Sequence, residues 1–426
     1  MVKPGGDHTH EIRDPVHGFV VYDDFERELI DSHPFQRLRR IKQLATTHLV
    51  YPGAVHTRFE HSLGVMHLAT EVFDELVHKH WDSVERVLGL TDRDELGRLR
   101  RVLRLAALLH DIGHAPFSHG PEELLPDGHE AVTVGVIEKT EIRDIIDERY
   151  YTKGIRVTDV IPVAVGAKKV TQLPSAIGQF LSEILTGPFG VDRMDYLLRD
   201  SLHTGVKYGQ FDVHRLVNTL TLTIHPETGN PVIALERGGV HAAEGLLLAR
   251  YFMFQQVYYH PVRRIYDWHL KQFVLDLLGH KPFPVDDLAE YLRWDDARVE
   301  YCLYRCPRSR SAASGRFFTG RGHLRMAFEA PEGRVEAYCD RAEELRTALL
   351  DKFGDKVYCD SEYQPLASDS ELALLVLGPD GSHSSCEKES KLFASLPPLG
   401  FLRVYAVDEP GLKERVSKFC RDFFAD

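Results

Sequence analysis

The chain has 426 residues, of which 43% are hydrophobic and 27% charged, proportions typical of a soluble globular protein. This length exceeds one ordinary hydrophobic core and predicts two or three domains. The formal net charge of −12 argues against a general nucleic-acid or membrane binder, because such proteins usually present a basic surface. An anionic substrate would therefore need a local basic pocket.

Other features of the sequence predict a location inside the cell, where cysteines stay reduced. No stretch approaches the roughly 20 apolar residues of a membrane span, and the opening MVKPGGDHTH lacks the apolar core of a signal peptide. The cysteines form no paired C-x-x-C motifs, which argues against a zinc site or a disulfide framework. They are Cys302, Cys306, Cys339, Cys359, Cys386 and Cys420. We expect a cytoplasmic protein.

Apolar residues recur every three or four positions through most of the first 280 residues, which predicts one helix after another. The predicted helices span residues 24–44, 57–78, 95–112, 130–149, 174–186, 191–202 and 240–280. Gly and Pro separate these runs. Residues 219–236 are the exception, because two alternating runs flank a turn-rich stretch. That pattern predicts a β-hairpin on a helical body.

The pattern changes beyond about residue 282. Predicted strands at 299–305 and 372–378 are mixed with predicted helices at 335–353 and 409–424. Residues 307–322 are polar, basic and rich in Gly and Ser, which is typical of a surface loop. We expect a mainly α protein with a helical part over residues 1–281. A smaller mixed α+β region over residues 282–426 is a candidate for oligomerisation or regulation.

An apolar helix that ends in ionisable groups is the most informative feature of the chain. In LRLAALLHDIGHAPFSHG, residues 103–120, the apolar run ends in His110 and Asp111 and is followed by His114 and His119. Buried imidazoles and carboxylates are costly unless a partner or a metal ion satisfies them. We therefore expect either a polar partner from elsewhere in the chain or a metal site.

Two other segments supply side chains of the same chemistry. His61 lies on a second apolar helix, and Asp192 and Asp195 begin a third. Two imidazoles with one or two carboxylates, and no thiolate, suit manganese, iron, cobalt, nickel or magnesium rather than a structural zinc. Such a set leaves positions for water and phosphate oxygens, as a hydrolase needs.

Ordinary structural roles are the alternatives for these residues. A lone histidine on an apolar helix, such as His67, is more often a hydrogen-bonded core residue than a ligand. Asp192 is also placed to cap the helix that follows it. The cluster at residues 110–119 favours a site, because Gly113 and Pro116 break the helix while the polar groups stay together.

A family resemblance runs through roughly residues 10–270. It is carried by HDIGHAPFSH, RFEHSLGV and VDRMDYLLRD, and further by IRDPVHG, PFQRLRRIKQL, YPGAVHTRFEHSLGV and ARYFMFQQVYYHPV. These segments resemble the HD-domain phosphohydrolases, and more narrowly the deoxynucleoside triphosphate triphosphohydrolases. That branch includes the human viral-restriction enzyme with an attached sterile-alpha motif, a motif that we do not expect here. The resemblance implies an HD-domain helical bundle, and the C-terminal third matches no motif.

The resemblance also implies a metal centre and its catalytic neighbours. The implied metal ligands are His61, His110, Asp111 and Asp192, with manganese favoured, and the implied catalytic residues are His114, His119, Glu122 and His129. His119 would protonate the sugar 5′-oxygen that leaves the α-phosphorus. Glu122 would orient and charge that imidazole, and it stands where the family usually has Asp.

Substrate recognition is implied residue by residue. The implied substrate-binding residues are Gln43, Arg58, Arg193, Tyr196, Asp200, Arg250 and Tyr258. The three arginines would bind phosphate, although a surface ion pair is the alternative for each. Gln43 and Asp200 would hold the 3′-hydroxyl. Tyr258 would pack where a 2′-hydroxyl would lie and so exclude ribonucleotides, unless it is an ordinary core aromatic.

A second nucleotide site between subunits is also implied. It would bind a guanine deoxynucleotide through Asp31, Gln36, Arg39 and Arg215. His10 stands where a Lys would be expected, and a neutral imidazole binds phosphate less strongly. We therefore expect a homo-oligomer, with a tetramer favoured, whose activation by dGTP is weaker or more pH-dependent than usual. The alternative for residues 31–40 is a capped, solvated basic helix.

The leading hypothesis is a metal-dependent hydrolase that converts deoxynucleoside triphosphates to deoxynucleoside and inorganic triphosphate and so controls their pool. One alternative keeps the metal site but acts on another nucleotide, as a phosphodiesterase or alarmone hydrolase. Another alternative is a non-catalytic nucleotide sensor or nucleic-acid binder with a vestigial site. Gln43, Asp200 and Tyr258 discriminate between the two enzymes, because a phosphodiesterase or alarmone hydrolase needs no deoxyribose pocket. The complete ligand set and the net charge of −12 argue against the non-catalytic alternative, since binding to a nucleic-acid backbone needs a basic surface.

Overall fold

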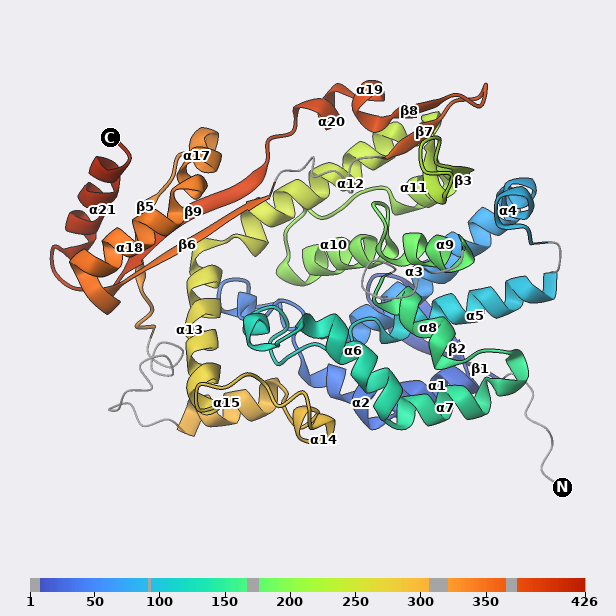
Figure 1. The fold of residues 1–426 in the computed structure, drawn as a ribbon, viewed down its shortest axis with the longest axis horizontal. Helices are drawn as coiled ribbons and strands as arrows, with labels where there is room; N and C mark the ends of the chain where they lie inside the picture. The colour runs from blue at the N-terminus through green and yellow to red at the C-terminus, as the bar shows by residue number, and fades with distance from the viewer. Residues whose placement is uncertain (1–7, 91–92, 167–175, 306–320, 365–373, 426) are drawn as a thin grey trace.

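The computed structural model describes residues 8–90, 93–166, 176–305, 321–364 and 374–425. Helices build a large body, and a smaller sheet with its own helices stands at the end of the molecule near the C-terminus (Figure 1). The predicted fold class, mainly α with a mixed α+β C-terminal region, is confirmed. Within these residues, no helix combines the length and the apolarity that crossing a membrane requires.

The helical body follows the predicted order of helices. It contains α1 (Asp24–Asp31), α2 (His33–Arg37), α3 (Arg58–Lys79), α4 (Trp81–Leu88), α5 (Arg93–Leu109), α6 (Gly128–Lys139), α7 (Glu141–Arg149), α8 (Val157–Ala164), α9 (Ala176–Thr186), α10 (Val191–Thr204), α11 (Val213–Thr219), α12 (Val240–Met253) and α13 (Pro261–Leu277).

Three of the predicted helices, at 24–44, 130–149 and 240–280, are interrupted, each for a local reason. Pro34 starts α2 as a separate helix after α1 has ended, because proline suits only the first turn. The Thr140 hydroxyl accepts the Ile142 N–H at 3.4 Å and begins α7. The π-helical turn Phe254–Tyr258 and Pro261 separate α12 from α13.

Helix α3 lies at the centre of the body and packs against α5 and α10. The Glu60 carboxylate accepts the Thr57 N–H at 2.7 Å, which fixes the first turn of α3. Gly64 lets α10 approach closely, because a Cβ there would lie 2.1 Å from Oδ1 of Asp195. The close packing brings His61 of α3 next to the first turn of α10.

Two hairpins lie at the edges of the body. Strands β1 (Thr9–Asp14) and β2 (Gly18–Asp23) pair antiparallel, a hairpin that the sequence analysis missed. The predicted hairpin at 219–236 is confirmed as β3 (Leu220–Ile224) and β4 (Pro231–Glu236). The C-terminal region extends that sheet, since β7 (Leu375–Leu377) runs parallel to β4 and pairs with β8 (His383–Ser385).

A second sheet forms the core of the C-terminal region, with β9 between β5 and β6. Its strands are β5 (Arg325–Glu329), β6 (Val357–Gln364) and β9 (Leu399–Ala406), and the helices of the region are α17 (Val335–Asp340), α18 (Ala342–Phe353), α19 (Cys386–Glu389), α20 (Lys391–Ser395) and α21 (Leu412–Phe423). The predicted helices at 335–353 and 409–424 are confirmed by α17, α18 and α21.

The strand predicted at 299–305 is wrong. These residues belong to α15 (Asp296–Arg305), which follows α14 (Leu288–Tyr291). Val299 and Leu303 are buried four residues apart on one face of α15. The β-branched and aromatic residues favour a strand, but the burial of this helical face outweighs that preference. The loop predicted at 307–322 lies almost wholly outside the described residues, and the division of the chain at residues 281 and 282 stays a prediction.

Helix α13 joins the helical body to the C-terminal sheet (Figure 1). The Arg264 guanidinium donates two hydrogen bonds to the Asp360 carboxylate of β6, at 2.8 and 2.9 Å. Ile265 packs with Leu324 and Tyr405 on the same side of the helix. These contacts hold β6 against the body.

Acid should loosen this junction. Burial lowers the pKa of His269 to about 3 and that of His323 to about 4. Both imidazoles must be neutral, because His269 Nε2 accepts the Leu324 N–H at 3.2 Å and His323 Nε2 accepts a hydrogen bond from Arg325 at 2.7 Å.

A base whose pKa falls on folding stabilises the folded state fully above its unfolded pKa of about 6.5, and this stability is lost as the pH falls towards the folded value. We expect His269 to contribute a loss of up to about 1.4 kcal/mol per pH unit between about pH 6 and its folded pKa, and His323 to contribute a smaller loss over a narrower range of pH. Thermal unfolding followed between pH 7 and pH 4 should show a weaker pH dependence in His269→Gln. An identical dependence in wild type and variant would contradict the assignment.

Candidate metal centre and substrate cavity

Three segments bring the predicted metal ligands together: α3, the turn after α5, and the start of α10. Nε2 of His61 lies 3.0 Å from Oδ1 of Asp192, and Nε2 of His110 lies 3.6 Å from the same oxygen. Oδ2 of Asp111 lies 3.5 Å from Nε2 of His61, and Oδ1 of Asp111 lies 3.5 Å from Nε2 of His110. Asp192 does not cap α10, whose N-cap is Gly190, so the capping alternative is wrong.

The second nitrogen of each imidazole shows where its proton lies. Nδ1 of His61 is 2.8 Å from Oδ2 of Asp195, and Nδ1 of His110 is 2.8 Å from the Ala107 carbonyl oxygen. Both oxygens can only accept, so both Nδ1 atoms carry hydrogen. Nε2 of His110 is buried and has no hydrogen-bond partner among the described residues. An imidazole oriented through its Nδ1–H, with Nε2 directed at a carboxylate, is typical of a metal ligand.

The electrostatics of the centre suit a divalent cation. Burial raises the pKa of Asp111, but Arg58 and the neighbouring imidazoles outweigh it and hold that pKa well below its usual range. Burial lowers the pKa of His61, but hydrogen bonds with Asp192 and Asp195 raise it to about 10. A cation therefore competes with a proton at His61. Two imidazoles and two carboxylates without a thiolate fit such an ion.

A buried ionic chain behind His61 was missed by the sequence analysis. Asp195 accepts from His61 through one oxygen, and its other oxygen is 2.6 Å from Nε2 of His17. The Arg199 guanidinium donates to both oxygens of Asp195, at 2.8 and 2.9 Å, and to Asp14 at 2.8 Å. The available signal was the four-residue spacing of Asp195 and Arg199, which predicts an ion pair on one helix. Asp195 thus orients the imidazole of His61.

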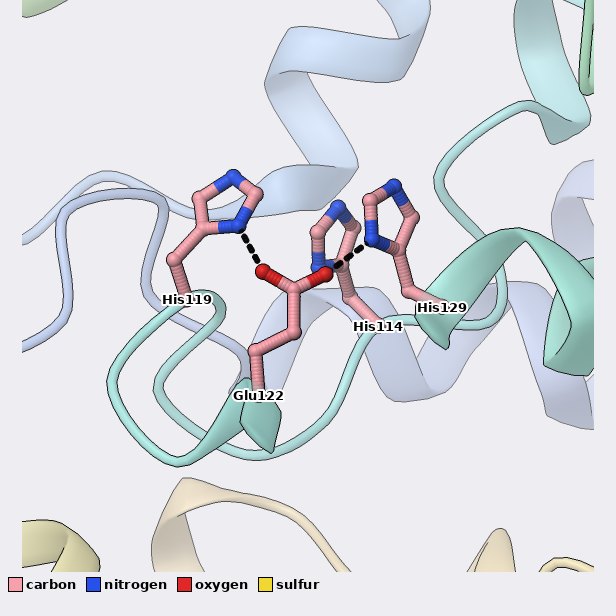
Figure 2. A group of neighbouring side chains, drawn as sticks. All are labelled: His114, His119, Glu122 and His129. Atoms are coloured by element: carbon pink, nitrogen blue, oxygen red, sulfur yellow. Dashed lines mark hydrogen bonds and ion pairs between the residues drawn. The ribbon is translucent and has the colours of Figure 1, made fainter. Parts of the chain in front are cut away.

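A second cluster contains the predicted catalytic residues (Figure 2). Glu122 lies between two imidazoles, with one oxygen paired with Nδ1 of His119 and the other with Nδ1 of His129. The ring of His114 stacks on that of His129 at a centroid distance of 3.8 Å. Burial raises the pKa of Glu122, but the two hydrogen bonds hold it well below its usual range. The ligating atoms of the four residues lie within 4.8 Å of one another, a spacing that also suits a cation.

His114 and Arg58 connect the two clusters. Nε2 of His114 lies 3.2 Å from Oδ1 of Asp111, and burial together with the charge of Arg58 keeps the pKa of His114 well below its usual value. Arg58 donates to Asp111 at 2.5 Å and to the Ser118 hydroxyl at 2.9 Å. Ser118 and Phe117 have φ values of 51° and 58°, a strained backbone of the kind found at functional sites.

A cavity of about 620 Å³ opens beside both clusters. Every predicted catalytic and substrate-binding residue lines it, together with Asp111 and Asp192. The Tyr258 hydroxyl donates to Oδ2 of Asp200 at 2.7 Å, and Nε2 of His56 lies 2.7 Å from Oδ1. Oε1 of Gln43 is buried without a hydrogen-bond partner in the part of the chain that the structure describes. The cavity thus contains a buried acceptor without a partner and a carboxylate whose two oxygens are both paired.

The cavity also contains residues that the sequence analysis did not single out. They are Leu44, Glu130, Thr186, Gly187, Gly190, Phe254, Tyr259, Arg263, Arg264, Glu362 and Gln364. Glu362 and Gln364 come from β6, in the C-terminal third, for which no motif was recognised. Phe254 and Tyr259 lie within the segment ARYFMFQQVYYHPV, so the resemblance of that segment to the family was the available signal for them.

The predicted effector residues lie outside this cavity. Asp31 is exposed and 3.4 Å from Arg27. Oε1 of Gln36 accepts from Arg39 at 2.9 Å, and that guanidinium lies 3.4 Å above the Phe59 ring. Arg215, on α11, donates to the Gly238 carbonyl at 3.1 Å. His10 is paired with Asp24 at 2.7 Å. Their role in effector binding stays a prediction.

Comparison with known proteins places this site in a family. An HD domain model matches residues 58–161, and a model of the HD associated region matches residues 211–347. A solved structure of a hypothetical protein from Aquifex aeolicus is 34% identical with a TM-score of 0.77 and covers 96% of this chain and 99% of its own.

Curated relatives match over a shorter range. Uncharacterized protein YwfO of Bacillus subtilis is 38% identical over 270 residues, which is 62% of this chain and 55% of that protein. Deoxynucleoside triphosphate triphosphohydrolase SAMHD1 of Gallus gallus is 33% identical over 232 residues, which is 48% of this chain and 35% of that protein. The chain therefore spans about half the length, or less, of these curated relatives.

Proposed function

This chain belongs to the HD-domain family of metal-dependent hydrolases, and from that premise we propose that it hydrolyses deoxynucleoside triphosphates to deoxynucleoside and inorganic triphosphate. One observation carries the proposal. A single cavity joins the metal centre to the pair formed by Asp200 and Tyr258. A phosphodiesterase or alarmone hydrolase has no need of a pocket that excludes a 2′-hydroxyl, so this pair favours a deoxynucleotide.

The residues of the cavity divide the chemistry among them. His61, His110, Asp111 and Asp192 would hold a divalent cation, which would supply Lewis-acid polarisation of a phosphate and activation of water. Manganese is our favoured ion, before iron, cobalt, nickel and magnesium. Arg58, Arg193 and Arg250 bind phosphate oxygens. His119, oriented by Glu122, donates a proton to the sugar 5′-oxygen as it leaves the α-phosphorus.

The test is a product analysis with the manganese-loaded protein. Each deoxynucleoside triphosphate and each ribonucleoside triphosphate is incubated separately, and the products are resolved by ion-exchange chromatography. We expect deoxynucleoside and unbranched triphosphate in equal amounts. Orthophosphate as the first product would place the attack at another phosphorus, and pyrophosphate would mean that a phosphoanhydride bond breaks instead of the bond to the sugar 5′-oxygen. Either product would overturn the proposal.

Tyr258→Ala should relax the discrimination between deoxy- and ribonucleotides by about tenfold or more, because the wall against the 2′-hydroxyl is removed. Tyr258→Phe is the matched control, since it keeps the ring and loses only the hydrogen bond to Asp200. The ratio of kcat/KM for dATP to that for ATP measures the effect. An unchanged ratio in Tyr258→Ala would assign Tyr258 to the core instead.

Assembly and activation belong to the same proposal. We propose a homo-oligomer, with a tetramer favoured, in which Asp31, Gln36, Arg39 and Arg215 bind dGTP between subunits. An effector can change activity only through different affinities for two states of the protein. Hydrolysis of dCTP with and without added dGTP, in wild type and Asp31→Ala, tests this arrangement. Equal rates in all four conditions would remove the effector site.

A further inference from the structure

The C-terminal sheet contributes directly to the substrate cavity. Strand β6 ends at Gln364, and both Gln364 and Glu362 line the cavity that holds Asp111 and Asp192. In Figure 1, β6 runs from the C-terminal end of the molecule towards α12 and α13. Ion pairing of Arg264 with Asp360 fixes the strand there. The C-terminal region therefore supplies side chains to the site instead of serving only in assembly.

The charges give the cavity two different ends. At the metal end, Arg58 pairs with Asp111, and the proposed cation there would attract phosphate. Towards β6, Arg263 pairs with Asp267 at 3.0 Å and Arg264 with Asp360 at 2.8 Å, so the charge of each is balanced by a carboxylate. The Glu362 carboxylate adds a negative charge there, which repels a phosphate. A nucleotide with its triphosphate at the metal therefore directs its base towards β6.

The wall between the two ends is aromatic. The π-helical turn Phe254–Tyr258 presents Phe254 and Tyr258 to the cavity, and Tyr259 follows directly. Ring centroids of Phe254 and Tyr259 are 5.3 Å apart. π-helical turns occur frequently at functional sites, and aromatic side chains are platforms on which nucleobases stack. The base would thus pass Tyr258 and reach Glu362.

Glu362 retains hydrogen-bonding capacity in this position. Oε1 accepts from the Tyr259 hydroxyl at 3.3 Å, and Oε2 lies 3.3 Å from Arg264 Nη1. Both contacts are long, the side chain is 42% exposed, and each carboxylate oxygen has two lone pairs. A carboxylate accepts hydrogen bonds only, so it favours a partner with N–H donors.

On the basis of the proposed function, we propose that Glu362 determines base specificity by accepting hydrogen bonds from the N–H groups of the nucleobase. Guanine presents two adjacent donors, N1–H and the 2-amino group, which match the two oxygens of a carboxylate. Adenine and cytosine present one amino group each, and thymine presents a single ring N–H between two carbonyl oxygens that the carboxylate repels. The expected order of preference places dGTP first and dTTP last.

Glu362→Gln tests this proposal, because it keeps the size of the side chain and replaces one acceptor by a donor. We expect kcat/KM for dGTP to fall about tenfold relative to that for dTTP, the usual effect of losing a hydrogen bond to a charged group. Most of the change should lie in KM. Glu329→Gln is the matched control, since Glu329 lies on β5 of the same sheet, is 43% exposed and pairs with Arg403, but does not line the cavity.

The results distinguish a failure of base selection by Glu362 from a failure of the proposed hydrolase function. A dGTP to dTTP ratio that changes in Glu362→Gln and not in Glu329→Gln supports base selection. An equal loss on all four deoxynucleotides, or a loss that tracks a lower Tm, makes Glu362 a structural partner of Arg264 and overturns it. Tyr259→Phe, which removes the Tyr259 contact and keeps the carboxylate, should retain the wild-type ratio. A wild-type protein that hydrolyses none of the four overturns the proposed function itself.

Discussion

Replacing His110 by alanine should abolish metal binding and lower the hydrolytic rate about a thousandfold or more. Nε2 of His110 faces Asp111 and Asp192 at 3.5 and 3.6 Å and has no hydrogen-bond partner among the residues described. The variant loses one hydrogen bond, from Nδ1 to the Ala107 carbonyl. We therefore expect loss of the metal and of the rate together, with the fold intact.

Three measurements test this prediction. Mass spectrometry gives the metal content, circular dichroism reports the fold, and kcat gives the activity. His78→Ala is the control, because His78 lies on the same helix as His61 and is exposed. It should keep both metal and activity. Full activity in His110→Ala would exclude the metal centre described above, and an unfolded variant would show that the imidazole is structural.

Glu122→Gln should lower kcat about a hundredfold, within the usual range for general acid catalysis, and leave the metal at His61, His110 and Asp192 in place. The carboxylate is the shared partner of His119 and His129. An amide cannot accept from both imidazoles and removes the negative charge between them. KM should change little, because the hydrogen bonds of the Glu122 side chain go to His119 and His129.

The neighbouring Glu123 supplies a matched control. Its side chain is 79% exposed and pairs with Lys271 at 2.9 Å, so Glu123→Gln should behave as wild type. Metal content again separates two explanations for Glu122. If Glu122→Gln loses one equivalent of a second metal ion, the cluster is a second metal site, and the role of His119 as an acid is wrong.

The sequence predicted those features of the site that depend on local patterns. His110 and Asp111 stand out because an apolar helix ends at polar groups, and Gly113 shows why the turn is possible. A Cβ at Gly113 would lie 2.3 Å from the His129 carbonyl oxygen, so the turn requires the absence of a side chain. Periodicity likewise predicted most helices, because each helix buries one face.

Features that depend on distant pairing were not predictable in this way. Asp195 differs from Asp192 only in what surrounds it. Its partner His17 lies 178 positions away along the chain, and Asp14, which pairs with Arg199, lies 185 positions from that arginine. The β1–β2 hairpin is short, and the residues IRDPVHG within it indicated the family instead of a pair of strands. Glu362 lines the cavity because β6 packs on α13. The periodicity of neither segment predicts this packing.

The buried chain from Asp14 through Arg199 and Asp195 to His61 has a consequence for the N-terminal hairpin. Because Asp14 and His17 belong to the hairpin and its turn, opening the hairpin would release the group that orients a metal ligand. Anything that binds only the ordered centre must then stabilise the hairpin by mass action. Amide hydrogen exchange in β1 and β2 should therefore slow when metal is added and quicken when a chelator removes it, so the first strands of the chain act as a reporter of occupancy at the ion site.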